Sequence, residues 1–233
     1  MSLRQSHGSA MRSRFPLYDL ERAMTVSRKE SRLIDQLRSA IDRTVQEFRN
    51  YPYDFLSERD IQALLFNELR KETISLRYQH SAEGKNSEFG FSEPFSINPV
   101  TTEYYVPEGK IDVAVLSEPD SASNVWRQPC RIAIEIKLWQ PREREPKYFR
   151  DVEKLQRYQA HLQMAGRAFT GVAMLFVHPC IEQIPTAISK EELGDAYPQN
   201  GVALHLVTKE GHWWKQIPAL SLPQQGASLV QTH

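Results

Sequence analysis

The sequence predicts an α/β domain, with a mixed central β-sheet flanked by helices and an N-terminal helical extension. Apolar residues recur at helical spacing in some segments, while other segments are short apolar or alternating runs typical of strands. The helical segments precede and separate the strand segments, which is the order of an α/β domain. A length of 233 residues favours one domain with a short appendage, and 40% hydrophobic residues can supply its core.

The N-terminal part is expected to be a flexible arm followed by helices. Residues 1–30 mix basic residues with serine and glutamine and lack apolar periodicity, so we expect a mobile basic arm. Residues 31–56 contain a helix with an apolar stripe, which ends near Tyr51. A second helix begins after Ser57, a residue type suited to capping the free N–H groups of a helix.

The rest of the chain predicts strands and one further helix. Two strand segments are expected to pair as a hairpin, because a turn-rich stretch separates them. A later, continuously apolar run is typical of a strand buried on both faces. In chain order we expect a loop or hairpin at 81–90, strands at 103–116 (interrupted near Pro107) and 131–139, a helix at 147–164, strands at 171–177 and 202–208, and a tryptophan pair, Trp213 and Trp214, after the last strand.

Composition excludes several classes of protein. The 29 Lys and Arg residues balance 29 Asp and Glu residues, so nucleic-acid contacts would need a local basic patch. Only Cys130 and Cys180 are present, which argues against a disulfide framework or a zinc site and favours a reduced, cytoplasmic setting. No apolar run approaches the ~20 residues that span a bilayer, so we expect no membrane partner.

Acidic residues interrupt two of the expected strands. Asp112 lies in the first strand segment, and Glu135 and Lys137 flank Ile136 in the second. Because strand side chains alternate, Glu135 and Lys137 should point to one polar side and Ile136 to the core. On neighbouring strands, Asp112 and Glu135 would bring two carboxylates together, which is costly without a compensating cation. Mg²⁺ suits this set because it takes oxygen ligands.

This set of residues resembles the bipartite motif of the PD-(D/E)xK nuclease superfamily. The matching residues are Asp112, followed by Glu135, Ile136 and Lys137. Restriction endonucleases and archaeal Holliday-junction resolvases belong to this superfamily. The expected order of elements is also similar to that family's core, which consists of a helix, a three-stranded meander, a helix and a strand. The resemblance covers roughly residues 57–179. It implies a restriction-endonuclease-like fold.

The resemblance also implies a role for each matching residue. Asp112 and Glu135 would bind Mg²⁺, for which Mn²⁺ could substitute, and the carbonyl of Ile136 would complete the protein ligands. Lys137 would position the attacking water or help to deprotonate it. The family often has a proline where Ile111 stands before the aspartate.

Two helices are expected to add residues to this site. The family often supplies an acid from its first core helix, and Glu58 best matches that place, with Glu68 as the alternative. In the helix after the Glu-x-Lys strand, Arg150 and Lys154 are expected to reach a phosphate, and Gln156 to orient it or the water. The basic residues of that helix recur at helical spacing, which predicts a basic stripe.

Together these features predict a cytoplasmic, Mg²⁺-dependent nuclease that hydrolyses phosphodiester bonds of DNA, in restriction and defence, repair or recombination. The alternative is a catalytically inactive nuclease-fold module that binds nucleic acid or a partner protein. The nuclease-like domain would span residues 57–220, with a flexible tail at 221–233. A homodimer is a further option, since two copies would allow both strands of a duplex to be cut.

Overall fold

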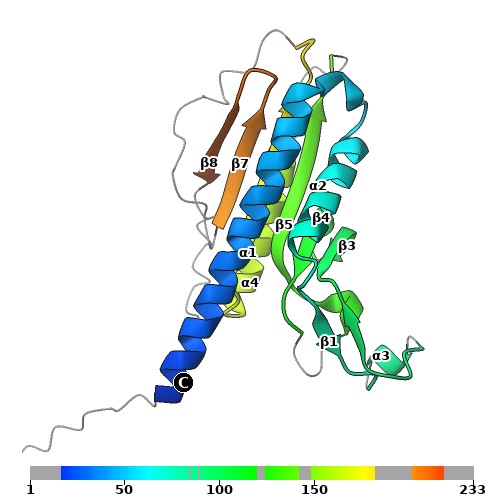
Figure 1. Ribbon diagram of the computed structural model, residues 1–233, viewed down its shortest axis with the longest axis vertical. Helices are drawn as coiled ribbons and strands as arrows, with labels where there is room; N and C mark the ends of the chain where they lie inside the picture. Colours follow the sequence, from blue (N-terminus) through cyan, green and yellow to red (C-terminus); the bar gives the residue numbers. More distant parts are fainter. Residues whose placement is uncertain are drawn as a thin grey trace, which may run out of the picture.

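A six-stranded mixed sheet, with the strand order β3-β4-β5-β6-β7-β8, organises the fold (Figure 1). The computed structural model describes residues 17–83, 85–88, 90–119, 124–141, 148–181 and 201–217. Its helices are α1 (Leu17–Asn50), α2 (Glu58–Glu72), α3 (Lys85–Glu88) and α4 (Tyr148–Met164), with two 3-10 helices, η1 (Pro52–Asp54) and η2 (Val125–Arg127). Its strands are β1 (Tyr78–His80), β2 (Phe95–Ile97), β3 (Val100–Val106), β4 (Gly109–Leu116), β5 (Cys130–Trp139), β6 (Thr170–Val177), β7 (Gly201–Val207) and β8 (His212–Ile217).

The strand directions confirm the predicted mixed sheet. Strands β3, β4 and β5 form an antiparallel meander, β5, β6 and β7 are parallel, and β8 is antiparallel to β7. Parallel neighbours require a crossover, and α4 lies in the crossover between β5 and β6. A separate pair, β1 and β2, is antiparallel, and the predicted loop or hairpin at 81–90 is part of the connection between these strands, which contains α3.

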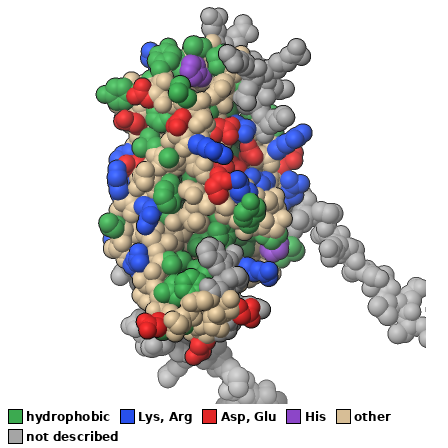
Figure 2. All heavy atoms as spheres, turned by 90° about the vertical axis from the view of Figure 1, so that its right-hand side faces the viewer, with side chains coloured by type: hydrophobic (Ala, Val, Ile, Leu, Met, Phe, Trp, Pro, Cys, Tyr) green, Lys and Arg blue, Asp and Glu red, His purple; other side chains and the backbone are tan. Residues whose placement is uncertain are grey.

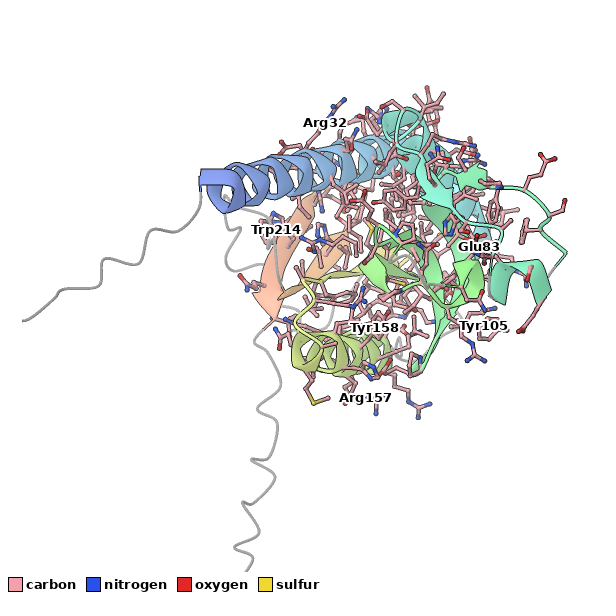
Figure 3. All side chains as sticks on the ribbon, turned by 90° about the horizontal axis from the view of Figure 1, so that it is seen from below. Arg32, Glu83, Tyr105, Arg157, Tyr158 and Trp214 are labelled. Atoms are coloured by element: carbon pink, nitrogen blue, oxygen red, sulfur yellow. The ribbon has the colours of Figure 1, made fainter. Side chains whose placement is uncertain are left out.

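Helices cover both faces of the sheet. Seen from below, α1, the sheet and α4 form successive layers (Figure 3). One hydrophobic core joins α1 and α2 to the sheet and includes Phe48, Leu65 and Ile134. A second core joins α4 to the other face and includes Leu155 and Leu175. Every residue of β6 is buried, as the continuous apolar run predicted.

The polar side that we expected for β5 is instead covered. The side chains of Glu135 and Lys137 share the face on which Ala133 belongs to the α4 core. The alternation of the strand predicted correctly that Glu135 and Lys137 share a face, but not that a helix packs over it. Within the sequence of β5 alone nothing distinguishes a solvated carboxylate from one buried under a helix.

Two boundaries also differ from the prediction. Helix α1 begins at Leu17 rather than near Ser31, because residues 17–30 are rich in strong helix formers even though they lack an apolar stripe. The rest of the expected arm, residues 1–16, and the expected tail at 221–233 lie outside the described residues. Trp213 and Trp214 belong to an additional strand, β8, whose adjacent tryptophans conceal the alternation typical of a strand.

The connection between α1 and α2 is anchored at both ends. The ring centroids of Phe55 and Phe48 are 5.5 Å apart. The ring centroid of Phe48 is in turn 5.0 Å from that of Phe176 on β6. Ser57 is the N-cap of α2 in a capping box, in which the Asp60 carboxylate accepts a hydrogen bond from the Ser57 N–H at 2.8 Å. This anchoring fixes the start of α2 relative to the sheet.

None of the helices within the described ranges is long and apolar enough to cross a membrane.

We predict that Phe48→Ala lowers the free energy of unfolding by about 3–5 kcal/mol, because it removes a fully buried ring that links α1 to β6. Chemical denaturation measures the change. Tyr53→Ala is the matched control, since its ring is 59% exposed and its loss should change stability by about 0.5 kcal/mol or less. Equal losses in the free energy of unfolding of both variants would contradict the packing of the Phe48 ring between α1 and β6.

Candidate active site

Charged side chains from four elements meet around β4 and β5. Asp112 belongs to β4, Glu135 and Lys137 to β5, Glu58 is the first residue of α2, and Lys154 belongs to α4. Figure 2 looks at the side of the molecule where α2, β3 and β4 lie, and shows basic and acidic side chains gathered near the middle of this face. The sequence placed these five residues in one site, and the fold brings them together.

The carboxylate of Asp112 lies where the β4–β5 ladder ends. The last paired residues are Val113 and Ile134. Beyond them, Asp112 Oδ2 accepts a hydrogen bond from the Ile136 N–H at 2.8 Å, so a side chain takes the place of a backbone partner. The N–H and C=O groups of one strand residue point to the same edge of the strand, and the Ile136 carbonyl therefore faces the Asp112 side of β5.

Glu135 is buried and only partly compensated. Its side chain is 5% exposed, and one oxygen, Oε2, lies 2.8 Å from Lys154 Nζ. The other oxygen, Oε1, is buried without a hydrogen-bond partner, which costs about 1–3 kcal/mol. Burial, with a further contribution from the charge of Asp112, raises the pKa of Glu135 to about 8, although Lys154 opposes the rise.

The two lysines of the site have carboxylate partners. Lys137 Nζ lies 3.0 Å from Glu58 Oε1. Burial alone would lower the pKa of Lys137, but the hydrogen bond and charge of Glu58 outweigh it and raise that pKa above its ordinary value. Lys154 also donates to the Lys110 carbonyl at 2.7 Å. Lys137 is therefore a cation, which suits it to stabilise negative charge better than to accept a proton.

Between the two candidate acids of α2, the structure places Glu58 at the site. Glu68 lies on the other part of the helix, where it pairs with Arg43 of α1 and with Lys71. These contacts hold α1 against α2. Glu68 is therefore part of the contact between α1 and α2, and of the two acids it is Glu58 that lies beside Lys137.

The expected basic stripe on α4 divides into two parts. Arg150 and Arg157 are exposed, and Arg157 points away from the sheet in Figure 3. Lys154 is turned inward, and 16% of its side chain is exposed. Gln156 is buried in α4 and does not lie on the exposed face with the arginines. The spacing of residues along a helix predicts, to within about one position, which part of the helix surface a side chain covers. It does not predict that a long lysine side chain reaches a buried carboxylate.

The sequence did not single out Asp151 as part of the cluster. Its Oδ1 lies 3.9 Å from Lys154 Nζ. Burial raises the pKa of Asp151, while Lys154 and Lys137 lower it. Because Asp151 precedes Lys154 by three residues, it shares a helix face with a lysine already assigned to the site, and that spacing could have identified it.

The sequence also did not identify three further residues near the site, which are Gln62, Glu103 and Lys110. Gln62 follows Glu58 by one helical turn, so the same face of α2 carries both residues. Its amide group contacts Glu103 on β3 and the backbone of Asp112. Glu103 also pairs with Lys110. Helical spacing could have identified Gln62, whereas Glu103 and Lys110 look like ordinary exposed strand residues.

The oxygen atoms of the site fit a hard divalent cation. Asp112 accepts from the Ile136 N–H, Glu135 is the preceding residue on β5, and the unpaired Glu135 Oε1 is an oxygen that a cation would satisfy. Over the described part of the chain, no group of three or more His, Cys, Asp or Glu side chains could hold a metal ion. The fitting set is thus two carboxylates and one backbone carbonyl, with water completing the coordination.

No family model, curated protein or solved structure is significantly similar to this chain.

We predict that the metal-free protein becomes less stable as the pH rises toward 8. Burial raises the pKa of Glu135 from its ordinary value of 4.5 to about 8 in the folded protein. Between these values the folded state holds a proton that the unfolded state lacks, so raising the pH favours unfolding by at most about 1.4 kcal/mol per pH unit.

Chemical denaturation in EDTA between about pH 6.5 and 8.5 measures this slope. In Glu135→Gln the side chain keeps an oxygen for Lys154 but has no proton to lose in this pH range. The free energy of unfolding of this variant should therefore change less steeply with pH than that of the wild type. Identical slopes in the two proteins would show that Glu135 is ionised throughout.

Proposed function

We propose that this protein is a Mg²⁺-dependent nuclease with a restriction-endonuclease-like core that hydrolyses phosphodiester bonds of DNA. The observation that carries the proposal is the pairing of two acids around one strand amide. Asp112 is bonded to the Ile136 N–H, and Glu135, the preceding residue, is buried with one oxygen unpaired. The order of α2, an antiparallel β3-β4-β5 meander, α4 and parallel β6 also agrees with the core that the sequence resemblance implied.

The cation would be held by Asp112, Glu135 and the Ile136 carbonyl, with Mn²⁺ as a substitute for Mg²⁺. Bound there, it would supply Lewis-acid activation of a phosphate oxygen and of a water molecule. The raised pKa of Glu135 means that this carboxyl must lose its proton before it can act as a ligand. Cation binding should therefore be stronger at higher pH.

The lysines would carry out the electrostatic part of the reaction. Lys137 would stabilise the negative charge that develops on the phosphate during hydrolysis. Glu58 holds the Lys137 ammonium through their ion pair and so limits where that charge can lie. Lys154 would keep the Glu135 side chain in place through its own ion pair.

We predict that Lys137→Ala reduces cleavage of DNA by about 10²–10³-fold, as expected when one preorganised charge-stabilising group is removed. Asp112→Asn should abolish cleavage and leave the fold intact, because the asparagine oxygen can still accept from the Ile136 N–H. Duplex, single-stranded and branched DNA with Mg²⁺ or Mn²⁺ are the substrates to assay.

Lys71→Ala is the matched control, since Lys71 also pairs with a glutamate of α2 but lies away from the site. Its activity should equal that of the wild type. No cleavage of any substrate by the wild type, or full activity in Lys137→Ala, would rule out the proposed reaction.

A second candidate is a nuclease-fold module that binds nucleic acid or a partner protein without turnover. It is favoured by the 2.8 Å contact between Lys154 Nζ and Glu135 Oε2, which occupies one oxygen of the buried carboxyl group without a cation. Calorimetric titration with Mg²⁺ separates the two candidates. A nuclease should bind the ion saturably and lose that binding in Glu135→Ala, whereas an inactive module should show no saturable heat.

We predict that DNA contacts come from the exposed arginines of α4 rather than from Lys154. Removing one phosphate contact lowers the slope of log affinity against log salt by about 0.9. In an Asp112→Asn background, which prevents cleavage, Arg150→Ala should reduce the slope by this amount. Lys154→Ala should leave it unchanged, because the Lys154 ammonium is bound to Glu135 and to the Lys110 carbonyl. The reverse pattern would assign the phosphate contact to Lys154.

A further inference from the structure

Asp112 lies at a break in the sheet on both of its sides. Toward β5, the ladder ends at Val113. Toward β3, the paired positions pass from Thr102–Val113 to Tyr104–Ile111 and omit Glu103 and Asp112. The backbone of the candidate cation ligand is therefore not held by regular strand pairing at this point.

Glu103, the residue opposite this break, has a strained backbone. Its φ is +57°, and within the described residues no other non-glycine residue has a positive φ. The left-handed region is unfavourable for a residue with a Cβ atom, and such residues persist where surrounding contacts enforce them, often at functional sites. The carboxylate of this residue pairs with Lys110 and accepts a hydrogen bond from Gln62.

Gln62 joins the strained residue to the candidate ligand. Its side-chain Nε2 donates to Glu103 Oε1 at 3.0 Å and to the backbone carbonyl of Asp112 at 2.7 Å. One amide group thus spans the gap between β3 and β4 where their ladder is interrupted. The carbonyl that it binds belongs to the same residue whose carboxylate is bonded to Ile136.

We propose that Gln62 and Glu103 are positioning residues of the cation site, which hold the backbone of Asp112 so that its carboxylate stays beside Glu135. The inference rests on the proposed function, because it concerns the same site. Glu103 fixes the Gln62 amide, and Gln62 fixes Asp112 in place of the missing strand pairing. The strain at Glu103 is the cost of bringing its carboxylate to Gln62.

Manganese titration of the full-length protein tests this inference, with calorimetry for affinity and electron paramagnetic resonance of Mn²⁺ for the bound ion. Gln62→Leu should weaken Mn²⁺ binding by about tenfold or more, the range typical for loss of a residue that orients a metal ligand. Gln36→Leu is the matched control, because Gln36 also donates to a backbone carbonyl at 2.7 Å, but from α1 to Glu72. Its Mn²⁺ affinity should equal that of the wild type.

Two substitutions of Glu103 separate positioning from stability. Glu103→Gln keeps an oxygen for Gln62 and should retain Mn²⁺ affinity within about threefold. In Glu103→Gly the backbone adopts the positive φ without strain, but the carboxylate oxygen that accepts from Gln62 is lost. Its denaturation midpoint should therefore not fall, while its Mn²⁺ affinity should drop by about tenfold.

The outcomes distinguish the inference from the proposed function. No saturable Mn²⁺ binding by the wild type would overturn both. Binding by the wild type with unchanged affinity in Gln62→Leu and Glu103→Gly would overturn the positioning role alone and leave the cation site standing. A variant that fails to fold does not remove the test, because the contrast between Glu103→Gln and Glu103→Gly is independent of Gln62→Leu.

Discussion

The burial of Glu135 in the central strand is the constraint on which the site depends. Strand β5 packs against α1 and α2 on one face and against α4 on the other, and the Glu135 side chain is 5% exposed, so its carboxyl group loses most of its hydration. Compensation has to come from the protein, and α4 supplies it through Lys154. The same helix closes the second core and connects β5 to the parallel strand β6. The contact with Glu135 and the connection from β5 to β6 therefore both require α4 at the same position.

Helix α2 serves two purposes with acids that look alike in the sequence. Glu58, at its start, holds Lys137 of the site, whereas Glu68, three turns later, holds Arg43 of α1. Apolar residues between them, Ile61 and Leu65, share a hydrophobic core with residues of the sheet. The helix therefore connects the scaffold to the site as one rigid element, and the position of each acid along it decides which part it serves.

Most of the architecture could be predicted because its signals are local. Apolar periodicity identified α2 and α4, and the continuous apolar run identified β6. The motif residues Asp112, Glu135 and Lys137 could be grouped because strand alternation and pairing bring them together. The strain at Glu103 and the inward turn of Lys154 could not be predicted, because each depends on contacts with residues far away in the sequence. A glutamate in a strand-like run predicts ordinary extended backbone, and a lysine among arginines predicts an exposed face.

The interrupted β3–β4 ladder has a consequence for how the chain folds. The residues that meet around Asp112 come from α2, β3, β4, β5 and α4, so their separations along the chain are large and closing those loops costs entropy. A hairpin of β3 and β4 alone contains neither Glu135 nor Gln62, and it leaves the Asp112 backbone unpaired at the break. The charged cluster is thus completed only when the distant segments have docked, and a ligand that recognises it would select the fully folded chain over its partly folded forms.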